Sequence, residues 1–436
     1  MTPAYQPVID RFVAPVPLDP LAGVLFLVAF VGAALVTARR PAYGAAALIL
    51  SIPFDFAHEL AGTTITMQKS VLLGVLAALA TYRGIPAMLR SAPARLILGA
   101  LLLYCVACAL TLLDAVHRGP AVRETLKAFE YAVLFATAFA AYRIDPDDAP
   151  IVVATAVAAI AVALSALAQE IAGAPSGLYV GAAIVPRVAG LLEGPNQLSA
   201  YCAIATAALG AWALVRRDAL LEGALALIVC ADLLTFSRAG LFGLAIVAAV
   251  LFAVGGKSAL SALRSAVAGA AFGALGCAWW IVYAHTPGVL RVSLQPSLYA
   301  GGVGNRNELW RAAWAMWREH PLLGVGAGNY EVELARFGVP GVRTHANSWY
   351  LQSLAEGGVV LFLATLGLVA AIFAAFARTL SLERLRAASP WVVAAPAASL
   401  ALVLHQVVDY LVFYPKVGAA WWVLVGLGAA ALTLRS

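Results

Sequence analysis

Charged residues are scarce in this sequence. Only 11% of its 436 residues are Asp, Glu, Lys or Arg, whereas 63% are hydrophobic, and the mean hydropathy is +0.90. A soluble domain usually carries about 25% charged residues. This composition excludes an ordinary soluble domain. The many apolar runs long enough to cross a bilayer predict an all-α polytopic membrane protein.

Cysteines and acidic clusters are also few. All five cysteines lie inside apolar runs, where they resemble small buried hydrophobic residues, so no zinc or disulfide framework is indicated. No Asp/Glu cluster with metal-ligand spacing stands between the apolar runs on the predicted outer side, and we expect neither a metal nor a cofactor. Basic runs with interleaved aromatic residues are missing as well. The net charge of +6 therefore does not indicate nucleic-acid binding.

Thirteen apolar segments predict membrane-spanning helices. The second and third are short for the roughly 20 residues that a span needs, so a count of twelve is equally compatible. We expect a single integral membrane domain over residues 1–436, with one long polar loop at 285–348 that contains amphipathic helices. The predicted spans are 21–38, 42–57, 70–83, 96–114, 125–142, 149–172, 196–215, 219–236, 239–255, 264–284, 349–377, 391–412 and 417–434.

Basic residues in the short loops predict the orientation of the chain. Pairs such as Arg39-Arg40 and Arg216-Arg217 belong in the cytoplasm by the positive-inside rule. Loop 285–348 then lies on the outer side. The side of the N-terminus depends on whether the spans number twelve or thirteen, and this stays open.

The predicted outer side nevertheless carries many cations. Five of them stand at the ends of apolar segments, and their convergence predicts an anionic ligand, although snorkelling explains any single one. Among these five we expect Arg187 and Arg238 to bind phosphate, because arginine forks and helix N-termini suit phosphate oxygens. Asn196 begins such a helix after a Gly-Pro turn. The five cations are Lys69, Lys127, Arg187, Arg238 and Arg343.

Residues 120–131, PAVRETLKAFEY, predict the start of a helix. Arg123, Lys127 and Glu130 share one face of it. An acid inside a span is usually paired, and Lys127 is the nearest cation to Glu130 in the sequence. A structural ion pair and a role in ligand binding remain equally open for Lys127.

Residues 304–319, which include Arg306, predict an amphipathic helix. Leu309, Trp310, Trp314 and Trp317 recur at helical spacing, so we expect this face to lie on the membrane or over a cavity. The glycine-rich stretch 320–331 after it lacks a nucleotide-loop signature, and we interpret it as a flexible lid.

A histidine and an aspartate lie close together near the end of the sequence. His405 and Asp409 are expected one turn apart within the same span. There they would form either a buried hydrogen-bonded pair or a proton relay.

The stretch 340–358, PGVRTHANSWYLQSLAEGG, runs from a polar segment into an apolar helix. Histidine is the side chain whose ordinary pKa permits proton transfer near neutral pH, so His345 is a candidate base for an acceptor hydroxyl or a group that positions it. We expect Arg343 to lower the pKa of His345 by charge repulsion. Alternatively, Arg343 and Asn347 only anchor and cap the helix.

Four stretches in this order resemble the O-antigen ligase and Wzy-type polymerase superfamily of bacterial glycosyltransferases: RVAGLLEGPNQLSAY, TFSRAGL, RNELWRAAWAMWREHPLLGVGAGNY and RTHANSWYLQSLAEGG. The resemblance covers residues 186 to about 362. It implies a GT-C-like membrane fold in the bacterial inner membrane, with the active site facing the periplasm. The donor would be a polysaccharide on undecaprenyl pyrophosphate and the acceptor lipid A–core. Many members read HAHN before the shared YLQ, so Asn347 stands where the second histidine is found.

The resemblance and the residue patterns together predict the site. We expect His345, Arg187 and Arg238 to be catalytic. The expected substrate-binding residues are Lys69, Arg123, Lys127, Asn196, Arg306, Arg343 and Asn347. The leading function is O-antigen ligase, by a metal-independent inverting transfer. The alternatives are a Wzy-type polymerase, a protein O-oligosaccharyltransferase, and a transporter of polysaccharide or lipid, although transporters often carry internal repeats that are not visible here.

Overall fold

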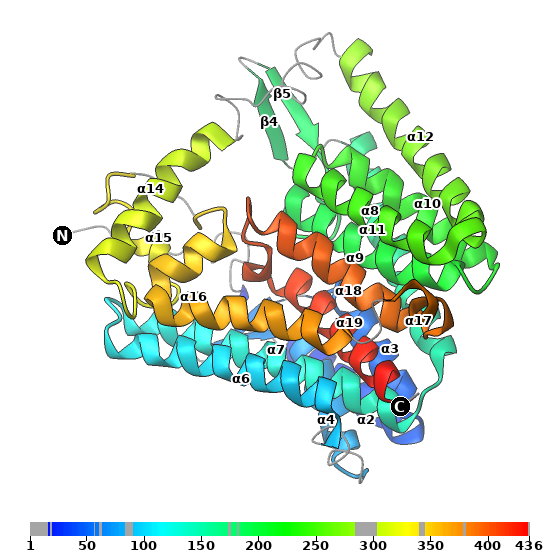
Figure 1. Ribbon diagram of the computed structural model, residues 1–436, viewed down its shortest axis with the longest axis horizontal. Helices are drawn as coiled ribbons and strands as arrows, with labels where there is room; N and C mark the ends of the chain where they lie inside the picture. Colours follow the sequence, from blue (N-terminus) through cyan, green and yellow to red (C-terminus); the bar gives the residue numbers. More distant parts are fainter. Residues whose placement is uncertain are drawn as a thin grey trace.

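In the computed structural model of the protein, the residues described are 16–17, 20–55, 57–60, 63–82, 90–172, 176–180, 183–283, 303–339, 345–377 and 381–434. Helices make up most of the described chain (Figure 1). The α-helices are α2 (Pro20–Arg39), α3 (Pro41–Ser51), α4 (Met67–Leu79), α6 (Ala92–Leu110), α7 (Arg118–Ile144), α8 (Asp148–Ala172), α9 (Pro195–Ala213), α10 (Ala219–Leu234), α11 (Arg238–Gly255), α12 (Ala259–Tyr283), α14 (Val303–Glu319), α15 (Tyr330–Glu333), α16 (Trp349–Phe376), α17 (Leu382–Ala387), α18 (Pro390–His405) and α19 (Pro415–Thr433).

Short 3-10 turns and strands complete the described elements. The 3-10 turns are η1 (Thr111–Leu113), η2 (Gly256–Ser258) and η4 (Leu411–Phe413). Strands β1 (Val16–Pro17), β2 (Ala57–Leu60) and β3 (Thr63–Thr66) form one sheet, in which β1 is parallel to β2 and β2 antiparallel to β3. Strands β4 (Ser176–Val180) and β5 (Ala183–Arg187) form an antiparallel hairpin. Because β5 ends at Arg187, the hairpin delivers this residue directly to the loop before α9.

Each of the thirteen apolar segments predicted from the sequence coincides with one of these helices. Within the described residues, six helices are long and apolar enough to cross a membrane unaided: α2, α6 with η1, α8, α11, α16 and α19. Others, such as α3, α4 and α18, are apolar but shorter. The predicted all-α polytopic membrane fold is confirmed.

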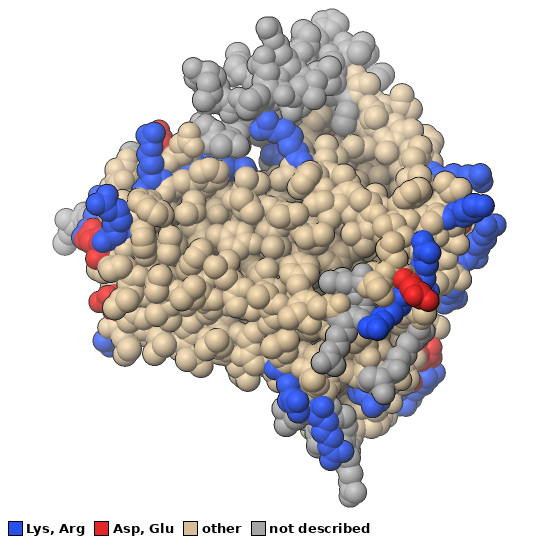
Figure 2. All heavy atoms as spheres, in the orientation of Figure 1, with Lys and Arg blue, Asp and Glu red and all other residues tan. Residues whose placement is uncertain are grey.

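The centre of the bundle is formed by α9 and α19. Every residue from Gln197 to Ala213 and from Val417 to Ala431 is buried. Small residues permit close packing between helices, since a Cβ at Gly426 would lie 2.6 Å from the carbonyl oxygen of Phe135 in α7. The peripheral helices α2, α6 and α11 instead expose leucines, valines and phenylalanines. One face of the molecule accordingly shows a broad surface without charged side chains, which gather at its edges (Figure 2).

Helix α16 is kinked, and the glycine-rich bend after α14 fills the kink. Gly358 has a positive φ of 57°, which interrupts the helical hydrogen bonds. The bend replaces them: Val325 N and Gly326 N donate to the carbonyls of Ala355 and Glu356 at 3.0 and 2.9 Å, and Val359 N donates to the Pro321 carbonyl at 2.9 Å. This buried packing contradicts the flexible lid expected for residues 320–331.

Helix α14 is amphipathic, as predicted, but of the predicted face only Leu309 packs fully on the protein. Leu309 and the small residues Ala312 and Ala313, with Met316, form the buried face. The tryptophans lie beside this face: Trp310 and Trp317 are half-buried, whereas Trp314 is 49% exposed and its ring lies 4.6 Å from that of Trp317. The expectation that this face lies on the membrane or over a cavity stays a prediction.

Candidate active site

Arg187 joins three segments of the chain. Its Nε donates to the carbonyl of Thr235 at 2.6 Å, after the end of α10. Its Nη2 donates to Oδ1 of Asn196 at 2.8 Å, in the first turn of α9. These bonds hold the half-buried guanidinium beside the beginning of α9.

Arg238 is the first residue of α11 and is exposed. Phe236 adopts a positive φ of 51° in the turn before it, and Ser237 caps the helix by accepting the Gly240 N–H. Gly240 lies directly against Ser199 of α9, where a Cβ would collide with the serine hydroxyl. The glycine of the TFSRAGL stretch thus allows the N-terminal turns of α9 and α11 to touch, and helix N-termini attract anions.

Arg306, near the start of α14, completes a group of three cations that we name the arginine cluster: Arg187, Arg238 and Arg306. The pKa of Arg187 is lowered to about 10, mainly by burial and also by the charges of Arg306 and Arg238, against the opposing effect of Asp409. The pKa of Arg306 is lowered by burial and by Arg238. The three guanidiniums therefore lie within electrostatic range of one another. Such a cluster favours an anion between its members.

Asp409 belongs to this site, although the sequence reasoning placed it in a helix with His405. Helix α18 ends at His405, and Asp409 lies in the turn that follows. Its Oδ2 accepts a hydrogen bond from Asn196 Nδ2 at 2.7 Å, so Arg187, Asn196 and Asp409 form a continuous chain. Burial raises the pKa of Asp409, but the neighbouring His345, His405 and Arg306 outweigh burial and hold it below its ordinary value.

His345 is buried, with only 6% of its surface exposed. It lies among the rings of Tyr410, Phe413 and Tyr414, whose centroids are 6.0, 5.6 and 5.9 Å from its own. The backbone N–H of Asn347 donates to Nδ1 at 3.1 Å, so in the neutral ring the proton resides on Nε2, which lies 3.2 Å from the Tyr414 hydroxyl. Asn347 itself has a positive φ of 50°.

The imidazole of His345 is kept neutral. Burial lowers its pKa, and the charges of Arg306 and Lys127 lower it further, against the opposing effect of Asp409. The sequence reasoning assigned this effect to Arg343, which lies outside the described residues. The neutral ring can accept a proton, which is what a general base near pH 7 requires.

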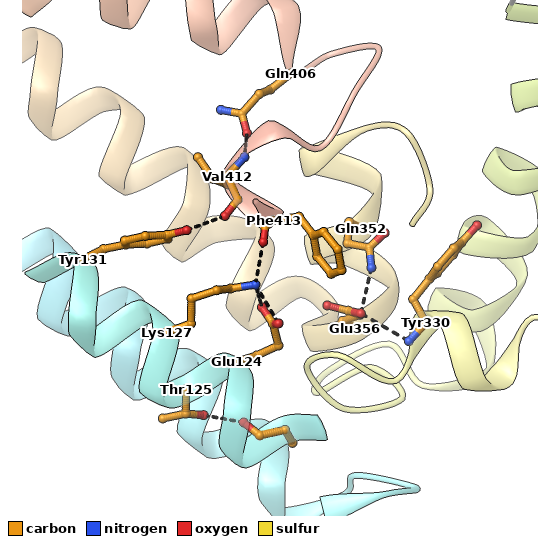
Figure 3. Close-up of polar contacts among 11 residues, drawn as sticks. Glu124, Thr125, Lys127, Tyr131, Tyr330, Gln352, Glu356, Gln406, Val412 and Phe413 are labelled. Atoms are coloured by element: carbon orange, nitrogen blue, oxygen red, sulfur yellow. Dashed lines mark hydrogen bonds and ion pairs between the residues drawn. The ribbon is translucent and has the colours of Figure 1, made fainter. Parts of the chain in front are cut away.

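The remaining predicted residues lie on α4 and α7. Lys127 pairs with Glu124 at 2.7 Å and donates to the Phe413 carbonyl at 3.3 Å (Figure 3). Glu130 has Lys69 as its ion-pair partner at 3.7 Å, so the ion pair considered for Lys127 forms with Glu124 and not with Glu130. Arg123 is exposed on α7. Among the predicted site residues the structure therefore gathers Arg187, Arg238, Arg306, Asn196, Asn347, His345 and Lys127, but not Arg123.

Two further residues were not predicted. Gln352 and Glu356, in the first turns of α16, are hydrogen-bonded to each other and to the backbone of the His345 loop and of α15 (Figure 3). Their spacing of four residues at the start of an apolar helix was the available signal, because buried polar side chains need partners.

The potential metal ligands of the described residues do not form a cluster. Within the described ranges, no three His, Cys, Asp or Glu side chains gather closely enough to hold a metal ion. The positive charges of the site come from arginine and lysine side chains, and metal-independent chemistry stays a prediction.

Part of the chain matches the model of a known protein family. Residues 223–366 match the model of the family Wzy_C, described as O-antigen ligase. No curated protein matches the chain. The matched region contains Arg238, Arg306 and His345, whereas Arg187 and Asp409 lie on either side of it. Its membrane-spanning helices make the protein a multi-pass membrane protein, and residues 223–366 are similar to the O-antigen ligase family.

Proposed function

We propose that this protein transfers O-antigen polysaccharide from undecaprenyl pyrophosphate to lipid A–core oligosaccharide, as an O-antigen ligase of lipopolysaccharide assembly. The observation that carries the proposal is the arginine cluster, which lies within electrostatic range of the buried pair His345 and Asp409. Cations suited to an anion, beside a candidate base in a membrane protein whose residues 223–366 match this family, support such a transfer.

The arginine cluster supports a pyrophosphate-linked donor. When the bond between the anomeric carbon and the phosphate oxygen breaks, negative charge develops on the departing undecaprenyl pyrophosphate. Arginine forks aimed at that charge stabilise it, and the N-terminal turns of α9 and α11 add further N–H groups. Three guanidiniums meet this need without a metal ion.

His345 supports activation of the acceptor. In our proposal, an acceptor hydroxyl replaces the Asn347 N–H at Nδ1 of His345 and delivers its proton there as its oxygen attacks the anomeric carbon. The reaction forms one glycosidic bond, breaks one glycosyl–phosphate bond and inverts the anomeric centre. The carboxylate of Asp409 favours the imidazolium that results, since it raises the pKa of His345.

The site would face the periplasm from the inner membrane. The arginine pairs Arg39-Arg40 and Arg216-Arg217 support this orientation, because short loops rich in arginine stay in the cytoplasm. The substrates would approach the arginine cluster from the opposite side, together with the surrounding membrane lipids.

A polymerase that uses a second lipid-linked glycan as acceptor is the second candidate, because the superfamily that the sequence resembles includes Wzy-type polymerases as well as ligases. Analysis of glycolipids from a deletion strain distinguishes the two. Loss of a ligase leaves long polymer on the lipid carrier and uncapped core. Core bearing single repeat units would instead indicate a polymerase and overturn the ligase assignment.

A further inference from the structure

Two polar side chains are buried in the first turns of α16. Gln352 is 2% exposed and Glu356 is 4% exposed. Gln352 Oε1 accepts the backbone N–H of Ala346 at 2.7 Å, and Gln352 Nε2 donates to Glu356 Oε1 at 2.7 Å. Both the oxygen and the nitrogen of the Gln352 amide are therefore hydrogen-bonded. Because the oxygen must face the Ala346 N–H and the nitrogen must face Glu356, only one orientation of the amide satisfies both partners.

Glu356 continues this chain towards α14. Its Oε1 also accepts the backbone N–H of Tyr330 at 3.2 Å (Figure 3). The backbone carbonyl of Glu356 accepts the N–H of Gly326 at 2.9 Å. The hydroxyl of Tyr330 in turn donates to the Leu309 carbonyl of α14 at 2.7 Å. A continuous series of hydrogen bonds therefore joins the peptide next to His345 to the helix that carries Arg306.

Burial of these groups costs stability unless every partner is in place. A carboxylate or an amide removed from water without hydrogen bonds is strongly unfavourable, and apolar residues would fill the same space at lower cost. Packing alone gives no reason for Gln352 and Glu356. Their hydrogen bonds give a reason for them. Gln352 fixes the backbone of Ala346, which lies between His345 and Asn347, and Glu356 fixes the backbone of α15.

We propose that Gln352 and Glu356 are positioning residues that hold His345 in register with the arginine cluster. This inference rests on the proposed function, because a general base must lie within hydrogen-bond reach of the attacking hydroxyl while the arginines bind the leaving group. Neither side chain needs to touch a substrate.

The variant Gln352→Leu removes both hydrogen bonds of the amide. We expect kcat to fall by roughly 100-fold, the cost of a displacement of about 1 Å at a reacting centre, whereas the KM for the donor stays near that of the wild type. Ser353→Ala is the matched control. Ser353 is the adjacent buried residue, and its hydroxyl bonds to Thr365 at 3.0 Å rather than to the His345 loop, so its loss should leave kcat unchanged.

The variant Gln352→Glu provides a sharper test. A carboxylate at this position faces Glu356 and repels it, but when the pair holds a proton the new carboxyl group has one donor and one acceptor, like the amide. The rate of this variant relative to the wild type should therefore rise as the pH falls. Gln352→Leu should show no such recovery. A constant ratio for Gln352→Glu, or wild-type kcat for Gln352→Leu, would overturn the inference.

Hydrogen exchange separates this inference from the proposed function. In detergent-solubilised full-length protein, the peptide containing Ala346 should exchange slowly in the wild type and faster in Gln352→Leu, with Ser353→Ala unchanged. If the wild-type protein transfers no glycan, the proposed function fails while this exchange measurement still tests the hydrogen bonds. Equal exchange in wild type and Gln352→Leu would refute the positioning role.

Discussion

Arg187 and Asp409 are brought together by Asn196 from distant parts of the sequence. Asn196 and Asp409 are 213 residues apart, yet their side chains lie within 2.7 Å of each other. The neutral amide between the two charges keeps Asp409 from neutralising the guanidinium through that bond. The guanidinium of Arg187 is therefore held in a fixed position, and Arg238 and Arg306 add positive charge near it. This arrangement suits reversible binding of an anionic ligand.

Substitution of the arginines tests the donor site. Arg187→Ala and Arg238→Ala should each lower kcat/KM by roughly 100-fold or more, because each removes a donor aimed at developing charge. Lysine should restore little, since it offers a point charge in place of a planar fork. Arg216→Ala is the control, because this residue lies in the loop after α9 and its side chain is 46% exposed. Near-normal transfer by Arg238→Ala would refute the assignment.

Substitution of His345 tests the base. His345→Ala should abolish transfer without weakening donor binding. In the wild type, the acid limb of the pH–rate profile should lie below 6.5, because burial, Arg306 and Lys127 lower the pKa of His345 from that ordinary value and transfer requires the neutral ring. Activity is then lost only as the pH falls through the lowered pKa. An acid limb at or above pH 6.5 would exclude His345 as the base.

At the scale of residues, the sequence allowed prediction of the cations and the histidine but not of their acidic partner. Asp409 was misplaced because the apolar pattern continues past His405 to Phe413, with no glycine or proline to mark the end of α18. Glu130 was assigned to Lys127 because they are three residues apart. Glu124 is equally close in sequence on the other side, and only the tertiary contact with Lys69 decides the pairing.

At the scale of elements, the kink of α16 depends on Gly358. Gly358→Ala should lower the melting temperature and the folded yield strongly, because the residue has a positive φ of 57° and a Cβ would collide with the backbone of Leu322. Gly367→Ala is the control in the same helix, where a Cβ meets nothing within 4 Å, and alanine there should maintain or raise stability. Thermal unfolding in detergent measures both. Equal stability of the two variants would contradict the kink described for α16.

The tryptophan side of α14 tests how this helix meets the membrane. In a variant without native cysteines, Trp314→Cys should react poorly with aqueous maleimide in intact membranes, whereas Arg311→Cys should react well. Because Trp314 is 49% exposed in the protein itself, protection of this position must come from lipid. Comparable labelling at both positions would show that α14 is solvated all round.

Helix positions were predictable because long apolar runs have few alternatives in a membrane protein. The side of each helix that is buried was less predictable than the position of the helix. The buried side of α14 rests on Ala312 and Ala313, whose small side chains allow close approach but add little to an apolar pattern dominated by tryptophan. The kink of α16 was missed because Gly357-Gly358 inside an apolar run is compatible with an unbroken helix.

At the scale of the whole molecule, the fold separates two environments. The buried helices α9 and α19 form the centre of an apolar bundle, and the arginine cluster lies where the N-terminal turns of α9 and α11 meet. A lipid-linked substrate has the same two parts, a chain for the membrane and a charged group for the arginines. The fold and the site thus agree on the class of molecule that we propose as donor.

The most direct test is transfer by the purified protein in detergent, with undecaprenyl-pyrophosphate-linked polysaccharide as donor, lipid A–core as acceptor and EDTA present throughout. We predict that polysaccharide-bearing lipid A–core forms with the wild type and fails to form with Arg238→Ala. Detergent leaves no bilayer to cross, so product formation would exclude transport as the sole function. Absence of product with the wild type, or product that forms only when magnesium or manganese replaces EDTA, would contradict the account.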